Sequence, residues 1–399
     1  MNRRKTFTLD EVCEFIVDCL HHTAPIQEDG FPSIRTPNIG KGRLLLEGVN
    51  RVSEETYQTW TQRAVPEAGD LILAREAPAG NVAIIKEGEK VCLGQRTVHL
   101  RPNPKIVDAD FLCYFLLAPP QQGNLLAAET GATAKHVNML DIRRLELSNL
   151  PDLTSQRAAG AMLAAYDDLI ENNRRRMVLL EDSARLLYRE WFVRLRFPGY
   201  EHTAIVGGVP QGWESRTLGD LCSDIRDLVL PEALEPDTPY IGLEHIPRRS
   251  ISLNEWGTAE QVTSSKSRFK AGEIIFGKIR PYFHKVGVAF VDGVASSDAI
   301  VIRPENEKLH GLVLMTMSSD EFVAVTAQQM KEGSKMPRAD WKQMQAYPVP
   351  LPPSGLLSNF DDVIQPIIAQ LKSLSFSNQK LRAARDLLLP RLMSGELAV

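Results

Sequence analysis

The chain has 399 residues, enough for two or more domains that each bury a core of their own. Apolar residues make up 43% and charged residues 24%, and the formal net charge is −4, which excludes a strongly cationic free-standing DNA binder but allows a local basic face. The sequence holds no apolar run of the about 18 residues needed to span a bilayer, and its basic N-terminus lacks an apolar signal segment. We therefore expect a cytoplasmic protein without a membrane partner.

The first part of the chain, residues 1–150, mixes short helical and strand patterns. Apolar residues at helical spacing predict helices over 9–20 and 110–118. Alternating apolar residues predict strands over 70–74, 81–86 and 97–101. This segment is expected to form one mixed α/β domain.

A long helix follows Leu150-Pro151, within residues 151–196, with Thr154 as its expected N-cap. Its apolar residues recur every three or four positions for four heptads, which is typical of a coiled coil. The predicted seam is Leu163, Tyr166, Ile170, Asn173, Met177, Leu180, Ala184, Leu187 and Trp191.

Residues 197–213 are rich in Pro and Gly and are expected to form a linker. A second mixed α/β domain follows over 214–352, with strands predicted over 273–277, 286–291 and 299–303. A second long helix is expected within 353–399. Its predicted seam is Ile364, Ile367, Leu371, Leu374, Asn378, Leu381, Arg385, Leu388 and Leu392.

Five local similarities between the two halves, each about 200 residues apart and in the same order, indicate a tandem duplication. The matched stretches are 8–13 with 217–222, Ile34 and Ile39 with Ile241 and Ile246, 68–73 with 271–276, 101–102 with 303–304, and 150–151 with 351–352. The chain is therefore expected to contain a pseudo-two-fold internal repeat.

Each predicted seam carries one asparagine, Asn173 and Asn378, and an unpaired buried amide is costly. If the two amides face each other they fix the register, and the helices must be antiparallel. The same register pairs Leu163 with Leu388, Ile170 with Leu381, Met177 with Leu374 and Leu180 with Leu371, and leaves Tyr166 against Arg385, whose guanidinium would stack on the ring or reach solvent. The alternative is that each helix packs only on its own domain. The expected fold class is α+β: two similar mixed α/β domains separated by two long antiparallel coiled-coil helices.

The sequence lacks the common motifs of catalysis and nucleotide binding, and it has no residues at metal-ligand spacing. Its five cysteines are scattered, as reduced core thiols would be. We expect neither a catalytic residue nor a metal site in this chain.

Several strings resemble the specificity subunits of type I restriction–modification systems. Residues 69–85, 93–102 and 130–138 are similar to stretches of a target-recognition domain, and 271–282, 296–304 and 333–341 to the equivalents in a second. Residues 186–192, 209–213 and 387–397 are similar to the ends of the family's spacer helices. The resemblance covers essentially the whole chain.

The resemblance implies a non-catalytic subunit that reads a split, asymmetric target in double-stranded DNA. It also implies two modification subunits that carry S-adenosylmethionine and methylate adenine, and restriction motor–nuclease subunits that use ATP and Mg. The chain itself would hold no cofactor. Two alternatives remain: a duplicated protein-interaction scaffold that does not bind DNA, and an orphan DNA-binding adaptor without a methyltransferase.

Within these strings, basic and amide side chains are the candidates for DNA contact, because they bind phosphates and the edges of guanine or adenine. In the first domain the candidates are Arg75, Gln95, Arg96, Lys135 and His136; in the second they are Lys278, Arg280, Lys335 and Arg338. The second set begins in 263–285, where Lys and Arg alternate with aromatic residues. The alternative for either set is a structural role in a solvated hairpin.

Overall fold

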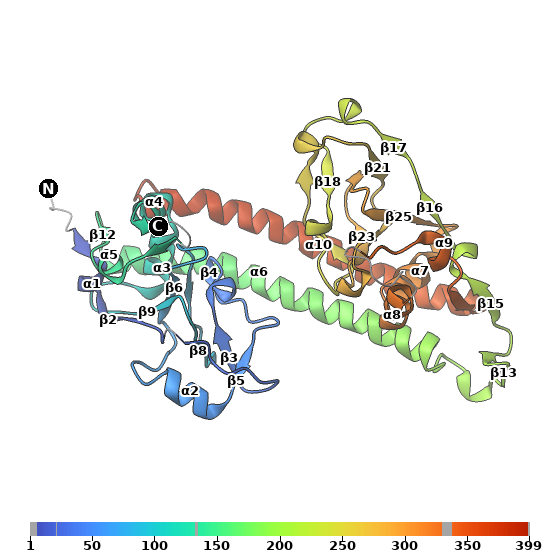
Figure 1. The fold of residues 1–399 in the computed structure, drawn as a ribbon, viewed down its shortest axis with the longest axis horizontal. Coiled ribbons are helices and arrows are strands. Elements are labelled where there is room, and N and C mark those ends of the chain that lie inside the picture. Colours follow the sequence, from blue (N-terminus) through green and yellow to red (C-terminus); the bar gives the residue numbers. More distant parts are fainter. Residues whose placement is uncertain (1–5, 21, 132–134, 329–336, 398–399) are drawn as a thin grey trace. The chain divides into compact units, whose positions relative to one another are not determined.

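The computed structural model describes residues 6–20, 22–131, 135–328 and 337–397. It divides into two compact units (Figure 1). The first unit comprises the chain up to Glu171 together with Gln379 onward, and the second comprises Asn172–Asn378. Each unit therefore combines one α/β part with a portion of both long helices.

The first unit is built on a five-stranded sheet, antiparallel except for one edge pair. In spatial order its strands are β2 (Cys13–Asp18), β9 (Thr97–Pro102), β6 (Leu71–Ala74), β7 (Val82–Ile84) and β4 (Gly42–Arg43), with β4 parallel to β7. A second sheet has the order β5 (Arg51–Val52), β3 (Phe31–Ile34) and β8 (Cys92–Leu93). The remaining elements are α1 (Leu9–Val12), α2 (Glu54–Trp60), α3 (Ala109–Leu117), α4 (Pro119–Ala127), α5 (Met139–Arg143), and the strand pairs β1 (Phe7–Thr8) with β12 (Glu146–Leu147) and β10 (Glu129–Thr130) with β11 (His136–Val137).

The second unit repeats this topology. Its main sheet has the order β16 (Cys222–Ile225), β25 (Ala299–Pro304), β22 (Ile274–Gly277), β23 (Val286–Ala289) and β19 (Ser252–Leu253), with β19 parallel to β23. Its other sheet has the order β17 (Leu228–Val229), β21 (Lys266–Phe269), β24 (Gly293–Ala295), β18 (Pro239–Ile241) and β20 (Gly257–Thr258). The further elements are α7 (His310–Met317), α8 (Asp320–Gln328), α9 (Trp341–Met344), β13 (Ile205–Val206) with β14 (Val209–Pro210), and β15 (Glu214–Thr217) with β26 (Pro348–Leu351).

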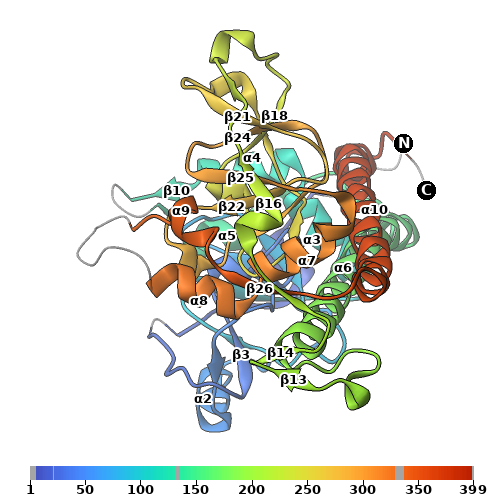
Figure 2. The ribbon, with the colours of Figure 1, turned by 90° about the vertical axis from the view of Figure 1, so that its right-hand side faces the viewer.

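The two main sheets match strand for strand, which confirms the internal repeat. The second sheets share the parallel pairs β3–β8 and β18–β24, but only the second unit adds β17 and β21. Within that unit, both views place the sheet with β18 and β21 away from α7 (Figures 1 and 2). The duplicated units have therefore diverged mainly in this second sheet.

The predicted strands of both units are confirmed, as is the helix predicted over 110–118, which is α3. The helix predicted over 9–20 is wrong, because only α1 is helical and the chain then enters β2. There Ile16 is fully buried and β2 pairs with β9. A local helical pattern has been overridden by sheet pairing, which accommodates the bulky run of Phe15, Ile16 and Val17.

The two long helices are α6 (Leu153–Tyr188) and α10 (Ser354–Met393), and α6 ends in a π-helical turn over Arg189–Val193. Thr154 is not the N-cap of α6. Instead Asp152 Oδ1 accepts hydrogen bonds from the backbone amides of Thr154 at 3.0 Å and Ser155 at 3.1 Å. A carboxylate is favoured there because it also opposes the positive end of the helix dipole.

The asparagine register is confirmed within the second unit. Asn173 Nδ2 donates to Asn378 Oδ1 at 2.9 Å, and the two residues are 9% and 4% exposed. Further along α6 in the same unit, the ring of Phe192 lies 4.8 Å from that of Phe360. Because a later residue of α6 meets an earlier residue of α10, the helices are antiparallel, and the alternative in which they pack only on their own domains is excluded.

The expected stacking of Arg385 on Tyr166 is replaced by a buried ion pair in the first unit. Arg385 Nη1 lies 2.5 Å from Asp167 Oδ1, and the Tyr114 hydroxyl donates to Asp167 Oδ2 at 2.6 Å. Burial beside this carboxylate raises the pKa of Tyr114 above its usual range. The guanidinium is thus paired with the carboxylates of Asp167 and, at 2.9 Å, Asp386 rather than stacked on the ring of Tyr166.

All five cysteines are free thiols, as the sequence predicted. Burial raises the pKa of Cys92 and of Cys222 to about 12. Such thiols stay protonated and unreactive at neutral pH. Among the described residues, no helix is both long and apolar enough to cross a membrane.

Candidate nucleic-acid interface

Three chain segments meet at the end of β6 in the first unit. The Arg75 amide donates to the Arg96 carbonyl oxygen at 3.0 Å, and the Val137 amide donates to the Arg75 carbonyl oxygen at 2.9 Å. Glu76 and His136 form an isolated antiparallel bridge. This backbone frame brings together Arg75, Arg96 and His136, which lie up to about 60 residues apart in the sequence. We call it the first junction.

Three predicted side chains at or beside the first junction, those of Arg96, Gln95 and Lys135, make polar contacts. Arg96 Nε lies 3.2 Å from Glu76 Oε1, with the arginine side chain 46% and the glutamate side chain 20% exposed. Arg96 has a φ of 71°, a left-handed conformation that is strained for arginine and often marks a functional loop. Gln95 Oε1 accepts from the Thr23 hydroxyl at 3.5 Å. Lys135, at 74% exposed, has Glu129 as a distant partner at 3.9 Å.

The second unit forms an equivalent frame at the end of β22, which we call the second junction. The Lys278 amide donates to the Asp298 carbonyl oxygen at 2.8 Å, and the Ala339 amide donates to the Lys278 carbonyl oxygen at 2.9 Å. Ile279 and Arg338 form the isolated bridge. Lys278 therefore occupies the place of Arg75, Asp298 that of Arg96, and Arg338 that of His136.

The second junction holds its charges differently. Arg338 Nη2 lies 3.2 Å from Asp298 Oδ1, with the two side chains 58% and 31% exposed. Lys278 Nζ donates to the Ser297 carbonyl oxygen at 2.9 Å. The backbone amide of Arg280 donates to the Pro337 carbonyl oxygen at 2.9 Å, which ties Arg280 to the same junction. Lys335 lies outside the described residues.

Arg280 belongs to an aromatic cluster beside the second junction. Its guanidinium carbon is 5.9 Å from the centre of the Phe283 ring, and that of Arg248 is 4.0 Å from the same ring. Tyr282, 52% exposed, packs edge-on against Phe283. Two cations around one ring form cation–π contacts that hold both guanidinium groups at the surface. Sequence reasoning missed Arg248, although an Arg-Arg pair at 248–249 in a short loop is a signal for it.

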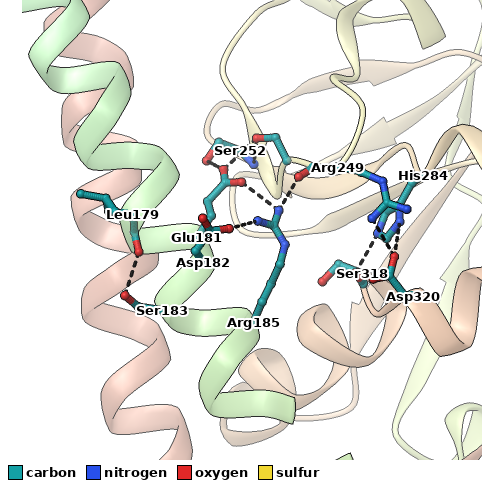
Figure 3. A network of polar contacts seen from close by, with 11 residues as sticks. Leu179, Glu181, Asp182, Ser183, Arg185, Arg249, Ser252, His284, Ser318 and Asp320 are labelled. Carbon is teal, nitrogen blue, oxygen red and sulfur yellow. Dashed lines mark hydrogen bonds and ion pairs between the residues drawn. The ribbon is translucent and has the colours of Figure 1, made fainter. Parts of the chain in front are cut away.

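A buried carboxylate of α6 fixes the loop that carries Arg248 (Figure 3). Glu181 Oε1 accepts hydrogen bonds from the hydroxyls of Ser250 and Ser252, each at 2.7 Å, and Glu181 Oε2 lies 3.0 Å from Arg185 Nη2. Because Ser250 is two residues from Arg248, the helix helps to position the aromatic cluster.

His284 anchors the other side of that cluster. Its Nε2 lies 2.8 Å from the Ser318 carbonyl oxygen, and its Nδ1 lies 3.5 Å from Asp320, which also pairs with Arg249 at 2.8 Å (Figure 3). Burial lowers the pKa of His284, so the ring is neutral at neutral pH. The loop that carries Phe283 is thus held by a hydrogen bond from the neutral imidazole of His284 to the Ser318 carbonyl oxygen.

Each unit also has a buried carboxylate that closes the turn before the strand that leads to its junction. Asp70 Oδ2 accepts from the Glu67 amide at 2.8 Å and is bonded to Arg101 and His99, at 2.8 Å and 2.6 Å. Burial pushes the pKa of Asp70 up, but the hydrogen bonds from Arg101 and His99 outweigh it and hold that pKa below its ordinary value.

In the second unit Glu273 takes the place of Asp70 and pairs with Arg303. The cations Arg101 and Arg303 are therefore both paired with a carboxylate within the fold.

The junctions can donate and accept hydrogen bonds, since they present guanidinium, ammonium and carboxylate groups on hydrogen-bonded backbone frames. The two carboxylates, Glu76 and Asp298, were not among the residues predicted from the sequence. Their signal is their position, since Glu76 directly follows Arg75 and Asp298 follows the serine pair of 296–297.

Comparisons with known proteins agree with this architecture. The model of the type I restriction modification DNA specificity domain matches residues 2–181 and 210–375. The chain is 23% identical over 381 residues to the type I restriction enzyme MjaIX specificity subunit of Methanocaldococcus jannaschii. That alignment spans 88% of this chain and 83% of that protein.

It is also 29% identical over 147 residues to the EcoDI specificity subunit of Escherichia coli, covering 36% of this chain and 32% of that protein. The crystal structure of the S subunit of a type I restriction–modification system from M. genitalium superposes with a TM-score of 0.61, at 14% sequence identity, over 98% of this chain and 97% of that one. With two matched copies of the domain covering most of its length, the chain belongs to the type I restriction modification DNA specificity family.

Proposed function

We propose that this chain is the non-catalytic, DNA-sequence-reading subunit of a cytoplasmic type I restriction–modification assembly. Residues 1–150 and 214–352 act as two target-recognition domains, and each reads one part of a split target in double-stranded DNA. The central helix (151–196) and the C-terminal helix (353–399) separate these domains, and 197–213 is the linker between repeats.

The observation that carries the proposal is the pair of matched junctions. The same backbone frame is built twice, by hydrogen bonds at Arg75 and at Lys278, yet different charged side chains are mounted on it. Equal frames fit equal positions against a duplex, whereas unequal side chains select unequal bases. The two parts of the target should therefore differ, and the full target should be asymmetric.

The partners proposed are those that the family resemblance implies. Two modification subunits bind S-adenosylmethionine and methylate adenine in the target, and restriction motor–nuclease subunits use ATP and Mg. This chain directs both activities and holds no cofactor itself. The names of the relatives, which are specificity subunits of type I restriction enzymes, support this assignment.

Methylation mapping tests the proposal. The full chain is expressed with its modification subunits in a host without other methyltransferases, and methylated adenines are mapped across the genome. A single two-part motif with unequal halves is expected. Absence of methylation with retained sequence-specific binding would instead favour an orphan adaptor.

Binding of the purified assembly to duplex DNA, measured over a range of salt, separates the proposal from a protein-interaction scaffold. Phosphate contacts release counterions, so the logarithm of the binding constant should fall linearly with the logarithm of the salt concentration. A flat dependence with no sequence preference would overturn the DNA-binding role.

A further inference from the structure

Each junction contains one arginine that is paired with a carboxylate on a neighbouring segment. In the first junction Glu76, after β6, holds Arg96, before β9. In the second, Asp298, before β25, holds Arg338, on the segment after the undescribed 329–336. The carboxylate and the arginine thus come from different segments in both units, although the arginine occupies different places on the frame.

The geometry of both pairs leaves hydrogen-bonding capacity on the arginine. The contact of Arg96 with Glu76 is made by Nε, 3.2 Å from Oε1, rather than by a terminal nitrogen of the guanidinium. The contact of Arg338 with Asp298 is made by Nη2, 3.2 Å from Oδ1. The arginines are also more exposed than their partners, at 46% against 20% and 58% against 31%. In each pair the carboxylate is the more buried side chain, and the guanidinium is the more exposed to solvent.

A held guanidinium is suited to a planar ligand with two acceptors. Its fork binds two acceptors in one plane, and guanine presents such a pair, O6 and N7, in the major groove. Fixing a long side chain in advance lowers the conformational entropy lost on binding. Lys278, in contrast, has its ammonium bonded to the Ser297 carbonyl oxygen and offers a point charge rather than a fork.

We propose that Glu76 and Asp298 are specificity-determining positioning residues, which aim Arg96 and Arg338 at one guanine in each half of the target. This inference rests on the proposed DNA-reading function. Each junction is built from three segments. In chain order, Arg96 lies on the second segment of its junction, whereas Arg338 lies on the third. The two guanines should therefore lie at different places within their half-sites.

Selection from a randomised duplex library tests the inference. The full chain, assembled with its modification subunits, is incubated with the library at fixed salt, and bound DNA is sequenced. Arg96→Ala and Arg338→Ala should each lower the preference for guanine at one position by about tenfold or more, in different half-sites. Glu76→Gln and Asp298→Asn should reduce the preference at the same positions as their partner arginines, while Asp298→Glu should retain part of it.

Ion pairs elsewhere in the same units provide matched controls. Asp292→Asn removes the partner of Lys270, 2.9 Å away in the second unit, and Asp10→Asn removes that of Arg143, 2.5 Å away in the first. Both controls should leave the selected motif unchanged. Melting temperatures of all variants establish that a change in motif does not reflect loss of the fold.

The outcomes separate this inference from the proposed function. If the assembly that contains the unsubstituted chain selects no motif, the proposed DNA-reading function is wrong. If it selects a motif that the carboxylate variants leave unchanged, or weaken equally at every position, Glu76 and Asp298 do not position a reader. A loss of preference at a base other than guanine would overturn the assignment of the ligand.

Discussion

At the scale of single residues, a buried carboxylate of α6 joins three elements of the first unit. Asp167, 4% exposed, contacts Arg385 of α10 and Tyr114 of α3. Desolvating such a pair is costly, and removing Asp167 leaves Arg385 with the exposed Asp386, 2.9 Å away, as its remaining ion-pair partner. Replacing only one partner of this ion pair should therefore destabilise the fold strongly.

Replacing Asp167 with Asn should lower the free energy of unfolding by about 3 kcal/mol, the lower end of the range for a broken buried ion pair, because Arg385 keeps its charge and retains the exposed Asp386 as a partner. Urea denaturation of the full chain measures the loss. Asp182→Asn is the control, since Asp182 is a 63% exposed partner of Arg185 and should cost at most about 1 kcal/mol. Equal losses in the two variants would contradict a buried role for Asp167.

The turn carboxylate Asp70 should make the first unit sensitive to acid. Its folded-state pKa lies below the ordinary value, so it stabilises the fold above about pH 4, and this contribution is lost as the pH falls through the folded-state pKa. In Asp70→Asn the urea midpoint, followed by circular dichroism, should be lower at neutral pH and change less between about pH 5 and pH 3. Asp362→Asn, at an exposed site on α10, serves as the control and should keep the dependence of the unaltered chain.

At the scale of elements, the two long helices are aligned by a layer of two amides in a mostly apolar seam. Asn173 and Asn378 satisfy each other, while Met177, Leu371 and Leu374 belong to the same buried core of the second unit. An amide layer costs stability compared with an apolar one but penalises any register that separates the two amides. The asparagines therefore specify alignment more than they contribute strength.

Asn173→Leu should destabilise the chain by about 1–3 kcal/mol, because the amide of Asn378 stays buried without a partner. The double variant with Asn378→Leu should recover most of this loss, since both polar groups are then removed together. Thermal unfolding of the two single variants and the double variant forms a double-mutant cycle. Additive effects in that cycle would contradict a direct contact between the amides.

At the scale of the whole molecule, each unit has cores of its own. The core around Phe111 uses residues of the first unit only, and the core around Phe322 uses residues of the second only. Both rings are fully buried. Because the buried apolar residues are segregated in this way, the units should respond separately to a core substitution.

Phe322→Ala should destabilise the second unit by about 3–5 kcal/mol, the usual cost of emptying a buried phenylalanine site. Hydrogen exchange should then rise in peptides of 214–352, whereas β6 and β9 keep their protection. Phe111→Ala should give the reverse pattern. Equal loss of protection in both units, for either variant, would indicate a single cooperative fold.

Much of the architecture was determined by the sequence alone, because it depends on local periodicity and on repetition. The heptads of α6 and α10, the Asn173–Asn378 register and the two-fold duplication all follow from spacing. Once each helix buries one amide, few other registers of the two helices are favourable, because most of them would separate the two amides. The candidates Arg75, Arg96, Lys278 and Arg338 also came from the sequence, as basic residues in matching strings, and their role in reading DNA is still a prediction.

Only the tertiary structure decided which of these side chains meet. The helix expected at 9–20 became mostly strand because β9 offered a pairing edge, and Arg385 found Asp167 rather than Tyr166. Glu76 and Asp298 entered the candidate site through contacts with Arg96 and Arg338, about 20 and 40 residues away in the chain. Sequence periodicity sets which face of an element is buried, but the approach of distant loops depends on how the whole chain packs, and so the partners of these arginines could not be read from it.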